Sequence, residues 1–149
     1  MQTEQFLRDL GVLDRELIEH RIRTIFERRA QGDMPGIIEY AAEDILFHVR
    51  GDWTLYPFSR PARGKASATQ MLAMIETMYE NLGSTIHELV IDGDRAAVHR
   101  TSKLRNRGTG NVVSIDVCDF FRFRDGLVVE FSEYPDSAAL AKLDRPDEA

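Results

Sequence analysis

The 149 residues carry 25 acidic and 19 basic side chains, and this net charge of −6 argues against a nucleic-acid-binding surface, which normally shows a basic excess. With 43% hydrophobic and 30% charged residues, the composition indicates one globular domain with a sizeable core. The single cysteine excludes an internal disulfide and a cysteine-based metal cage. Because no apolar run approaches ~20 residues and no leader-like segment is present, we expect a cytoplasmic protein without a membrane span.

The first half of the chain has the apolar spacing of helices. We expect residues 1–13 to form an extension, followed by a helix that Asp14 caps and Gly32 stops. The basic residues of this helix alternate with apolar ones, which indicates a solvated helix face rather than a polyanion site: Arg21, Arg23, Arg28 and Arg29. A second, shorter helix is expected over 33–42 and a third over 68–82.

Strand patterns begin at "ILFHV", residues 45–49, and dominate the second half of the chain. Between them lies a long irregular segment, 50–64, and loops of this length are often functional. After the third helix, alternating strands are expected with short turns between them, at 85–92, 95–105, 112–124 and 127–134. Residues 144–149 are expected to form a flexible tail. Helices followed by an antiparallel meander predict an α+β domain with its helices on one face of the sheet.

Four segments resemble, in order, the SnoaL-like and ketosteroid-isomerase-like branch of the nuclear transport factor two superfamily. They are "GDMPGIIEYAAEDILFHV", "PARGKASATQML", "VIDGDRAAVHRTSKL" and "DFFRFRDGLVVEFSEYPDSAAL", and the resemblance extends over residues 14–143. It implies a single SnoaL-like domain over 1–149 with a cone-shaped fold, in which a strongly curved, mostly antiparallel sheet wraps around three helices and leaves an apolar pocket. It also implies a homodimer, which we expect to form through the convex face of the sheet. Members include isomerases, polyketide cyclases, epoxide hydrolases, dehydratases and binding modules, so the site must decide the function.

Strand alternation over 117–123 places Asp119 and Phe121 on one face. The resemblance implies that Asp119 stands where ketosteroid isomerases hold an oxyanion-binding acid and the cyclases a proton-transferring acid. Apolar neighbours raise the pKa of a carboxyl group, so Asp119 is a candidate proton donor or acceptor. The alternative is a structural acid that an arginine satisfies. The isomerase tyrosine and general base align with Ile25 and Val49, which argues against steroid isomerisation by the usual residues.

The resemblance to epoxide hydrolases is partial. Their arginine and two acids align with Arg100, Ser102 and Glu133, so one acid is replaced by a serine. An arginine that bridges Asp119 and Glu133 would keep both ionised and oriented, which suits the activation of a water molecule. The same residues could equally form a buried ion-pair network without chemistry. The water-holding positions of the hydrolase align with apolar residues, Phe47 and Val49.

The other pocket candidates are aromatic or apolar. Trp53 and Tyr56 are expected to roof the pocket and to pack on an aromatic or polycyclic ligand. The family pattern turns His48 away from the pocket, which is lined instead by Phe47, Val49 and Phe121. Two histidines and a carboxylate at metal-ligand spacing do not occur in the sequence, so we predict no metal and no other cofactor.

The sequence therefore favours the hypothesis that the protein is a cofactor-free isomerase, cyclase or hydrolase, which transfers a proton on a small apolar or polycyclic molecule. In this hypothesis Asp119 is the acid or base, Arg100 and Glu133 orient it, and Ser102 supplies a hydrogen bond. The alternative is a non-catalytic dimeric module that binds a small ligand in the same pocket. A third possibility, an interaction domain with a filled core, is less favoured because polar residues are expected to face inward.

Overall fold

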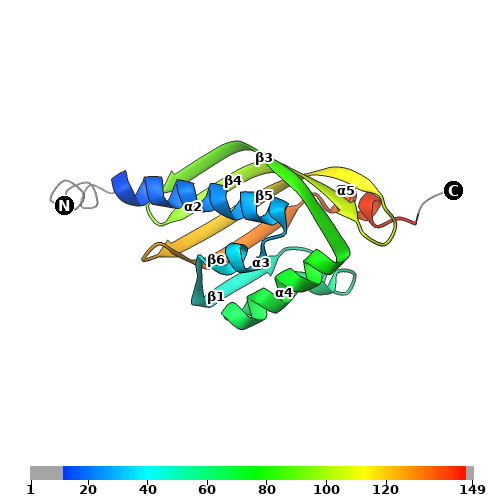
Figure 1. The fold of residues 1–149 in the computed structure, drawn as a ribbon, viewed down its shortest axis with the longest axis horizontal. Coiled ribbons are helices and arrows are strands. Elements are labelled where there is room, and N and C mark those ends of the chain that lie inside the picture. Colours follow the sequence, from blue (N-terminus) through cyan, green and yellow to red (C-terminus); the bar gives the residue numbers. More distant parts are fainter. Residues whose placement is uncertain (1–11, 147–149) are drawn as a thin grey trace.

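The computed structural model describes residues 12–146, and residues 1–11 of the expected extension lie outside this range (Figure 1). The first helix, α2 (Val12–Gln31), begins two residues before the expected cap, so that Asp14 lies in its first turn. Its buried side chains recur every three or four residues and form one apolar face: Ile18, Ile22, Ile25 and Phe26.

The second helix is shorter than expected. Asp33 caps α3 (Met34–Ile38) by accepting a hydrogen bond from the Gly36 amide at 3.0 Å. The helix was expected to continue to Ala42, but the strand β1 (Ala41–Val49) begins at Ala41. The reason is tertiary: Ala41 pairs with Val128 of the last strand, whose amide donates to the Tyr40 carbonyl at 2.8 Å. Strand pairing overrides the helical spacing of these alanines.

The segment 50–64 contains a turn of 3-10 helix, η1 (Pro57–Ser59), and a short strand, β2 (Ala62–Arg63), which pairs antiparallel with β1. Helix α4 (Lys65–Met78) follows directly. This third expected helix ends four residues early, because Tyr79 already pairs with Asn106 across the sheet.

The sheet has six strands in the order β2-β1-β6-β5-β4-β3. β1 runs parallel to β6, and all other neighbours are antiparallel. The four long strands form a meander, as the sequence predicts: β3 (Tyr79–Asp92), β4 (Arg95–Asn106), β5 (Val112–Arg124) and β6 (Leu127–Pro135). Figure 1 shows α2 lying across these strands and α4 beside β1. The predicted α+β fold with an open, mostly antiparallel sheet is confirmed.

A fourth described helix, α5 (Ser137–Leu143), was not expected. Asp136 caps it, and Leu140 and Leu143 bury their side chains under the sheet. Of the expected tail, residues 144–146 are described, and Asp144 accepts a hydrogen bond from the Tyr79 hydroxyl at 2.7 Å. None of the helices within residues 12–146 is long and apolar enough to cross a membrane.

Candidate active site

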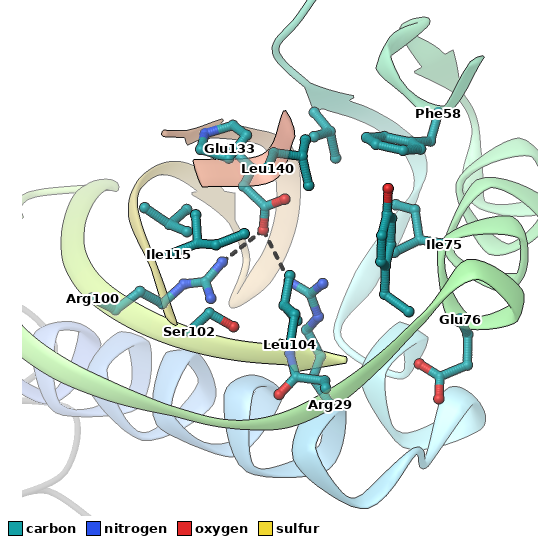
Figure 2. A pocket seen from close by; sticks show the side chains of 15 residues that line it. Arg29, Phe58, Ile75, Glu76, Arg100, Ser102, Leu104, Ile115, Glu133 and Leu140 are labelled. Carbon is teal, nitrogen blue, oxygen red and sulfur yellow. Dashed lines mark hydrogen bonds and ion pairs between the residues drawn. The ribbon is translucent and has the colours of Figure 1, made fainter. Parts of the chain in front are cut away.

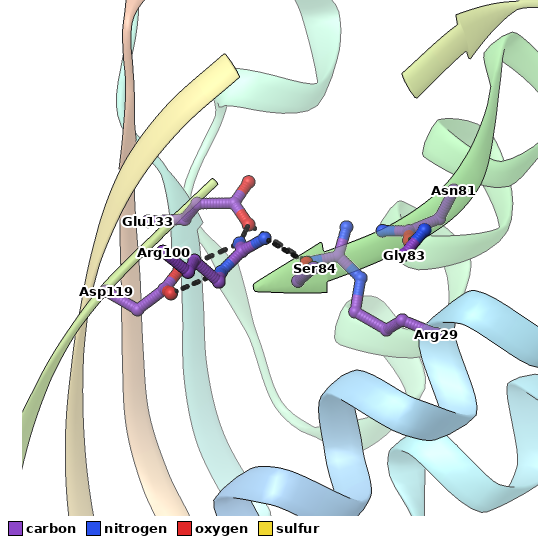
Figure 3. A network of polar contacts seen from close by, with 7 residues as sticks. All are labelled: Arg29, Asn81, Gly83, Ser84, Arg100, Asp119 and Glu133. Atoms are coloured by element: carbon purple, nitrogen blue, oxygen red, sulfur yellow. Dashed lines mark hydrogen bonds and ion pairs between the residues drawn. The ribbon is translucent and has the colours of Figure 1, made fainter. Parts of the chain in front are cut away.

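Three of the predicted site residues meet on the inner face of the sheet. Asp119 on β5 is the direct cross-strand partner of Glu133 on β6, and Arg100 on β4 lies diagonally opposite Asp119. Arg100 donates to both Asp119 oxygens, from Nε to Oδ2 at 2.6 Å and from Nη2 to Oδ1 at 3.1 Å. Its Nη2 also donates to Glu133 Oε1 at 2.6 Å (Figure 3). Arg100 therefore bridges the two carboxylates.

Arg100 is held rigidly in the interior. Its side chain is 1% exposed, and its Nη1 donates to Ser84 Oγ at 3.1 Å. The guanidinium carbon lies 4.4 Å from the centre of the Phe26 ring, which adds a cation–π contact. Bonds to three side chains on three strands leave this arginine little freedom to rotate.

A fourth charged residue, Arg29, reaches the site from helix α2. Its Nη1 donates to Glu133 Oε1 at 3.0 Å. The interpretation of its basic run as a solvated face is wrong for Arg29, whose side chain is only 14% exposed. The sequence does contain the signal: Arg29 follows Ile22 by seven residues and Ile25 by four, so it shares the buried face of the helix.

The Glu133 carboxylate accepts hydrogen bonds from the two arginines through only one of its two oxygens. Both guanidinium groups donate to Oε1, while Oε2 accepts no hydrogen bond from any residue in the described chain. Figure 2 shows the second oxygen turned away from both arginines. Burial raises the pKa of Glu133, but the charges of Arg29 and Arg100 outweigh it, so the pKa lies below its usual 4.5. Glu133 is therefore ionised at neutral pH and has one free oxygen.

Asp119 has a different environment. Its side chain is fully buried, and burial raises its pKa to about 6, against the opposing charge of Arg100. Both of its oxygens bind Arg100. Asp119 lies behind Arg100 and does not line the neighbouring cavity, which Arg100 does line. Its hydrogen bonds are therefore with Arg100 and not with a molecule in that cavity.

A cavity of about 50 Å³ adjoins Glu133 and Arg29. We call it the polar cavity, after its lining by Arg29, Asn81, Arg100, Ser102 and Glu133. This volume holds a few water molecules or a small organic group. The side chains of Glu133 and Arg29, which line this cavity, are 10% and 14% exposed.

The other residues that line the polar cavity are mostly apolar. They include Val49, as the sequence predicts, and Phe58, Ile75, Leu104, Ile115 and Leu140. Ser102 lies in this lining with a buried hydroxyl that has no protein hydrogen-bond partner in the described chain. A buried hydroxyl without a partner is costly unless a bound molecule satisfies it. The groups that the cavity presents to a bound molecule thus include a free acceptor, Glu133 Oε2, and the Ser102 hydroxyl.

The sequence matches the family model of the SnoaL-like domain over residues 22–131, which is most of the chain. This chain belongs to the SnoaL-like domain family. The family predicted from the four sequence segments is thereby confirmed. No curated protein matches the sequence.

Solved structures share the fold of this SnoaL-like domain. A nuclear transport factor two-like protein of Burkholderia xenovorans is 25% identical, with a TM-score of 0.70 over 87% of this chain and 97% of that one. A nuclear transport factor two-like protein of unknown function from Burkholderia pseudomallei is 18% identical, with a TM-score of 0.75 over 85% and 96%. An LEH-like epoxide hydrolase of M. tuberculosis is 17% identical, with a TM-score of 0.69 over 85% and 88%.

The remaining predicted pocket residues of the SnoaL-like domain lie outside the polar cavity. Phe47 and Phe121 line a second cavity. Trp53 is 52% exposed, and its ring packs on the guanidinium of Arg60 at 4.5 Å. Tyr56 packs on Phe58, which itself lines the polar cavity, with ring centres 5.4 Å apart.

No group of three or more potential metal ligands lies together within residues 12–146 of the SnoaL-like domain. His48 lies on β1 between the inward-facing Phe47 and Val49, and it is absent from the lining of both cavities. The chemistry that these residues can offer is acid–base chemistry by carboxylates under the control of two arginines.

Proposed function

We propose that this SnoaL-like domain is a cofactor-free enzyme that transfers a proton on a small, largely apolar molecule, with Glu133 as the base. The observation that carries the proposal is the asymmetry of the Glu133 carboxylate. A general base must be ionised and must offer a free lone pair within reach of the proton. Oε2 meets both conditions, because the two guanidinium groups keep Glu133 ionised and occupy only Oε1.

The other residues of the network have supporting roles in this proposal. Arg100 fixes the orientation of Glu133, and Asp119 fixes Arg100 with two hydrogen bonds. We therefore assign proton transfer to Glu133 rather than to Asp119, and we regard Asp119 as a positioning residue. The Ser102 hydroxyl would hydrogen-bond a polar group of the substrate in the cavity.

Two reaction types suit one ionised carboxylate beside an apolar cavity. Glu133 would abstract a proton either from a carbon next to a carbonyl group or from a water molecule that attacks an epoxide. The similar fold of a protein described as an epoxide hydrolase supports the second type only as an analogy of fold.

The second candidate function is a non-catalytic module that binds a small ligand. The observation that favours it is the lowered pKa of Glu133, because a weakly basic carboxylate is a poor general base and a good hydrogen-bond acceptor. In that case Glu133 and Ser102 would recognise a neutral polar group of the ligand.

The test uses two small probes with few non-hydrogen atoms, propylene oxide for water addition and but-3-enal for isomerisation. Wild-type protein is compared with Glu133→Gln and with Glu130→Gln, a matched variant on the same strand whose side chain pairs with Arg122 on the surface. We expect Glu133→Gln to lower kcat/KM for a productive probe by about 10²–10⁴-fold, the usual contribution of a general base. Glu130→Gln should leave it unchanged. Tight binding of both probes without turnover by the wild-type protein would instead support the binding module.

A further inference from the structure

A second cavity of about 40 Å³ lies in the core and is almost entirely apolar. We call it the apolar cavity, after its lining by Phe26, Phe47, Leu72, Phe121, Val128 and Phe131. Like the polar cavity, it is far below the roughly 300–1,000 Å³ of typical ligand pockets. Neither cavity alone has room for a fused bicyclic ring system.

The two cavities follow one another along the same strands. On β1, Val49 lines the polar cavity and Phe47 the apolar cavity. On β6, Glu133 and Phe131 lie in the same order. Residues two apart on a strand point to the same face and are roughly 7 Å apart. Only about one layer of side chains therefore separates the two spaces.

That layer is the charged network. On β5, Asp119 stands between Val117, which lines the polar cavity, and Phe121, which lines the apolar cavity. Arg100 lies against Asp119 at the same level. Arg29 contributes to the lining of both cavities. The wall between the cavities thus consists mainly of two arginines and a carboxylate.

The two arginines differ in how firmly they are held. Arg100 is 1% exposed and donates four hydrogen bonds, two of them to Asp119. Arg29 makes a single side-chain hydrogen bond in the described chain, to Glu133 Oε1, and it remains partly exposed. Rotation of Arg29 toward solvent would break one hydrogen bond, whereas displacement of Arg100 would break four. Arg29 is the movable part of the wall.

We infer that Arg29 is a displaceable partition, and that the natural ligand occupies both cavities at once after Arg29 has rotated away from Glu133. The ligand class is a neutral molecule with a hydroxyl or carbonyl group at the Glu133 end and an apolar, ring-containing body against the phenylalanines. A neutral head fits this end because Glu133 Oε2 and the Ser102 hydroxyl are free to form hydrogen bonds with it. The aromatic side chains that line the apolar cavity would pack against the apolar, ring-containing body of the ligand.

Displacement of Arg29 has a consequence for Glu133. With Arg29 gone, Arg100 alone would stabilise the anion, and the pKa of Glu133 would rise. Binding of the ligand would therefore make Glu133 a stronger base at the moment when a proton has to be removed. This consequence rests on the proposed function, whereas the joined cavity does not.

The test measures the binding of 2-naphthol, a neutral bicyclic probe, and of phenol, which has the same head on a shorter body, by isothermal titration calorimetry. Arg29→Ala removes both the bond to Glu133 and the partition, whereas Arg29→Met removes the bond and keeps an apolar side chain in the wall. Arg23→Ala, on the surface of the same helix, is the matched control.

We expect Arg29→Ala to bind 2-naphthol at least about tenfold more tightly than Arg29→Met, with no such difference for phenol. Arg23→Ala should bind both probes like the wild-type protein. In a crystal structure of the wild-type complex, the naphthalene ring should contact Phe121 and Phe131, with Arg29 released from Glu133. Equal affinities of Arg29→Ala and Arg29→Met for 2-naphthol would overturn the inference, as would a complex with the Arg29–Glu133 bond intact. Binding in the expected pattern, together with no turnover of either substrate probe of the proposed function, would support the inference and contradict the proposed function, so the two can fail separately.

Discussion

Replacement of Arg100 by methionine tests whether the buried network depends on this one residue. Methionine keeps an unbranched apolar side chain and removes the charge and the four hydrogen bonds of Arg100. Asp119 then loses both of its hydrogen bonds, and its fully buried carboxylate has no access to water. Glu133 keeps Arg29, so the substitution leaves one carboxylate unpaired rather than two.

Breaking a buried ion pair by removal of one partner costs about 3–5 kcal/mol. This is a large part of the roughly 5–15 kcal/mol by which a domain is stable. In a domain of this size it corresponds to a decrease in Tm of about 6–20 °C. The chain offers a matched control in Arg124, which donates two hydrogen bonds to Asp44 in a similar paired arrangement, with both side chains more than half exposed. Arg124→Met should cost no more than about 1 kcal/mol.

The assay is urea unfolding followed by circular dichroism at pH 8, for both variants and for the double variant Arg100→Met with Asp119→Asn. The double variant should recover most of the lost stability, because a neutral amide replaces the unpaired carboxylate. The deficit of Arg100→Met should also shrink as the pH falls from 8 toward 5. Without Arg100, the folded-state pKa of Asp119 lies above the present value of about 6, so the folded state binds the proton before the unfolded state does.

Two results would refute this reasoning. One is a loss of stability in Arg100→Met no greater than that in Arg124→Met, which would mean that burial of the pair does not matter. The other is a double variant no more stable than Arg100→Met, which would mean that Asp119 is not the group left unpaired.

Three further predictions concern other parts of the chain. Tyr79→Phe removes the hydroxyl that donates to Asp144 at 2.7 Å, and it should lower the free energy of unfolding by about 1.5–3 kcal/mol in urea, as expected for a hydrogen bond to a charged group. Ser102→Ala should change that free energy by less than about 1 kcal/mol, because no hydrogen bond to the described protein is lost, while turnover of a productive probe falls. Phe120 and Tyr134 pack edge to face on the outer side of the sheet and are about half exposed, and we propose that a second copy of the chain covers them. Sedimentation velocity should show a dimer for the wild-type protein and a monomer for Phe120→Asp, and a wild-type monomer would contradict this.

The sequence predicts the meander and the meeting of its acids well, because strand alternation is a local property. Strand alternation, read beside the family pattern, predicts Asp119 and Glu133 on one face of neighbouring strands, and the direct pairing in the structure agrees. The alanines at 41 and 42 were assigned to a helix because apolar spacing over a few residues does not separate helix from strand. The strand partner of Ala41 is Val128, more than 80 residues away, and this long-range pairing decides the outcome.

The site itself was only partly predictable. The residues that strand alternation places inward, Arg100 and Ser102, line the cavity, whereas the loop aromatic Trp53 projects into solvent. A loop conformation depends on packing that no periodicity encodes. Arg29 was missed because a charged residue in a basic run was assigned by its charge and not by its position on the helix, although that position is shared with buried isoleucines.

The most direct test of the central claim is the pH dependence of kcat/KM for the probe that the wild-type protein turns over fastest. This ratio reports the pKa of the essential base in the free enzyme. Because Asp119 has a pKa of about 6 and positions Arg100, the profile is measured for Asp119→Asn as well as for the wild-type protein. If Glu133 is the base, its pKa below 4.5 predicts that Asp119→Asn still turns the probe over, with a constant kcat/KM from neutral pH down to about 5 and a loss only at lower pH. Complete loss of turnover in Asp119→Asn would contradict the account, because it would make Asp119 the proton-transferring residue.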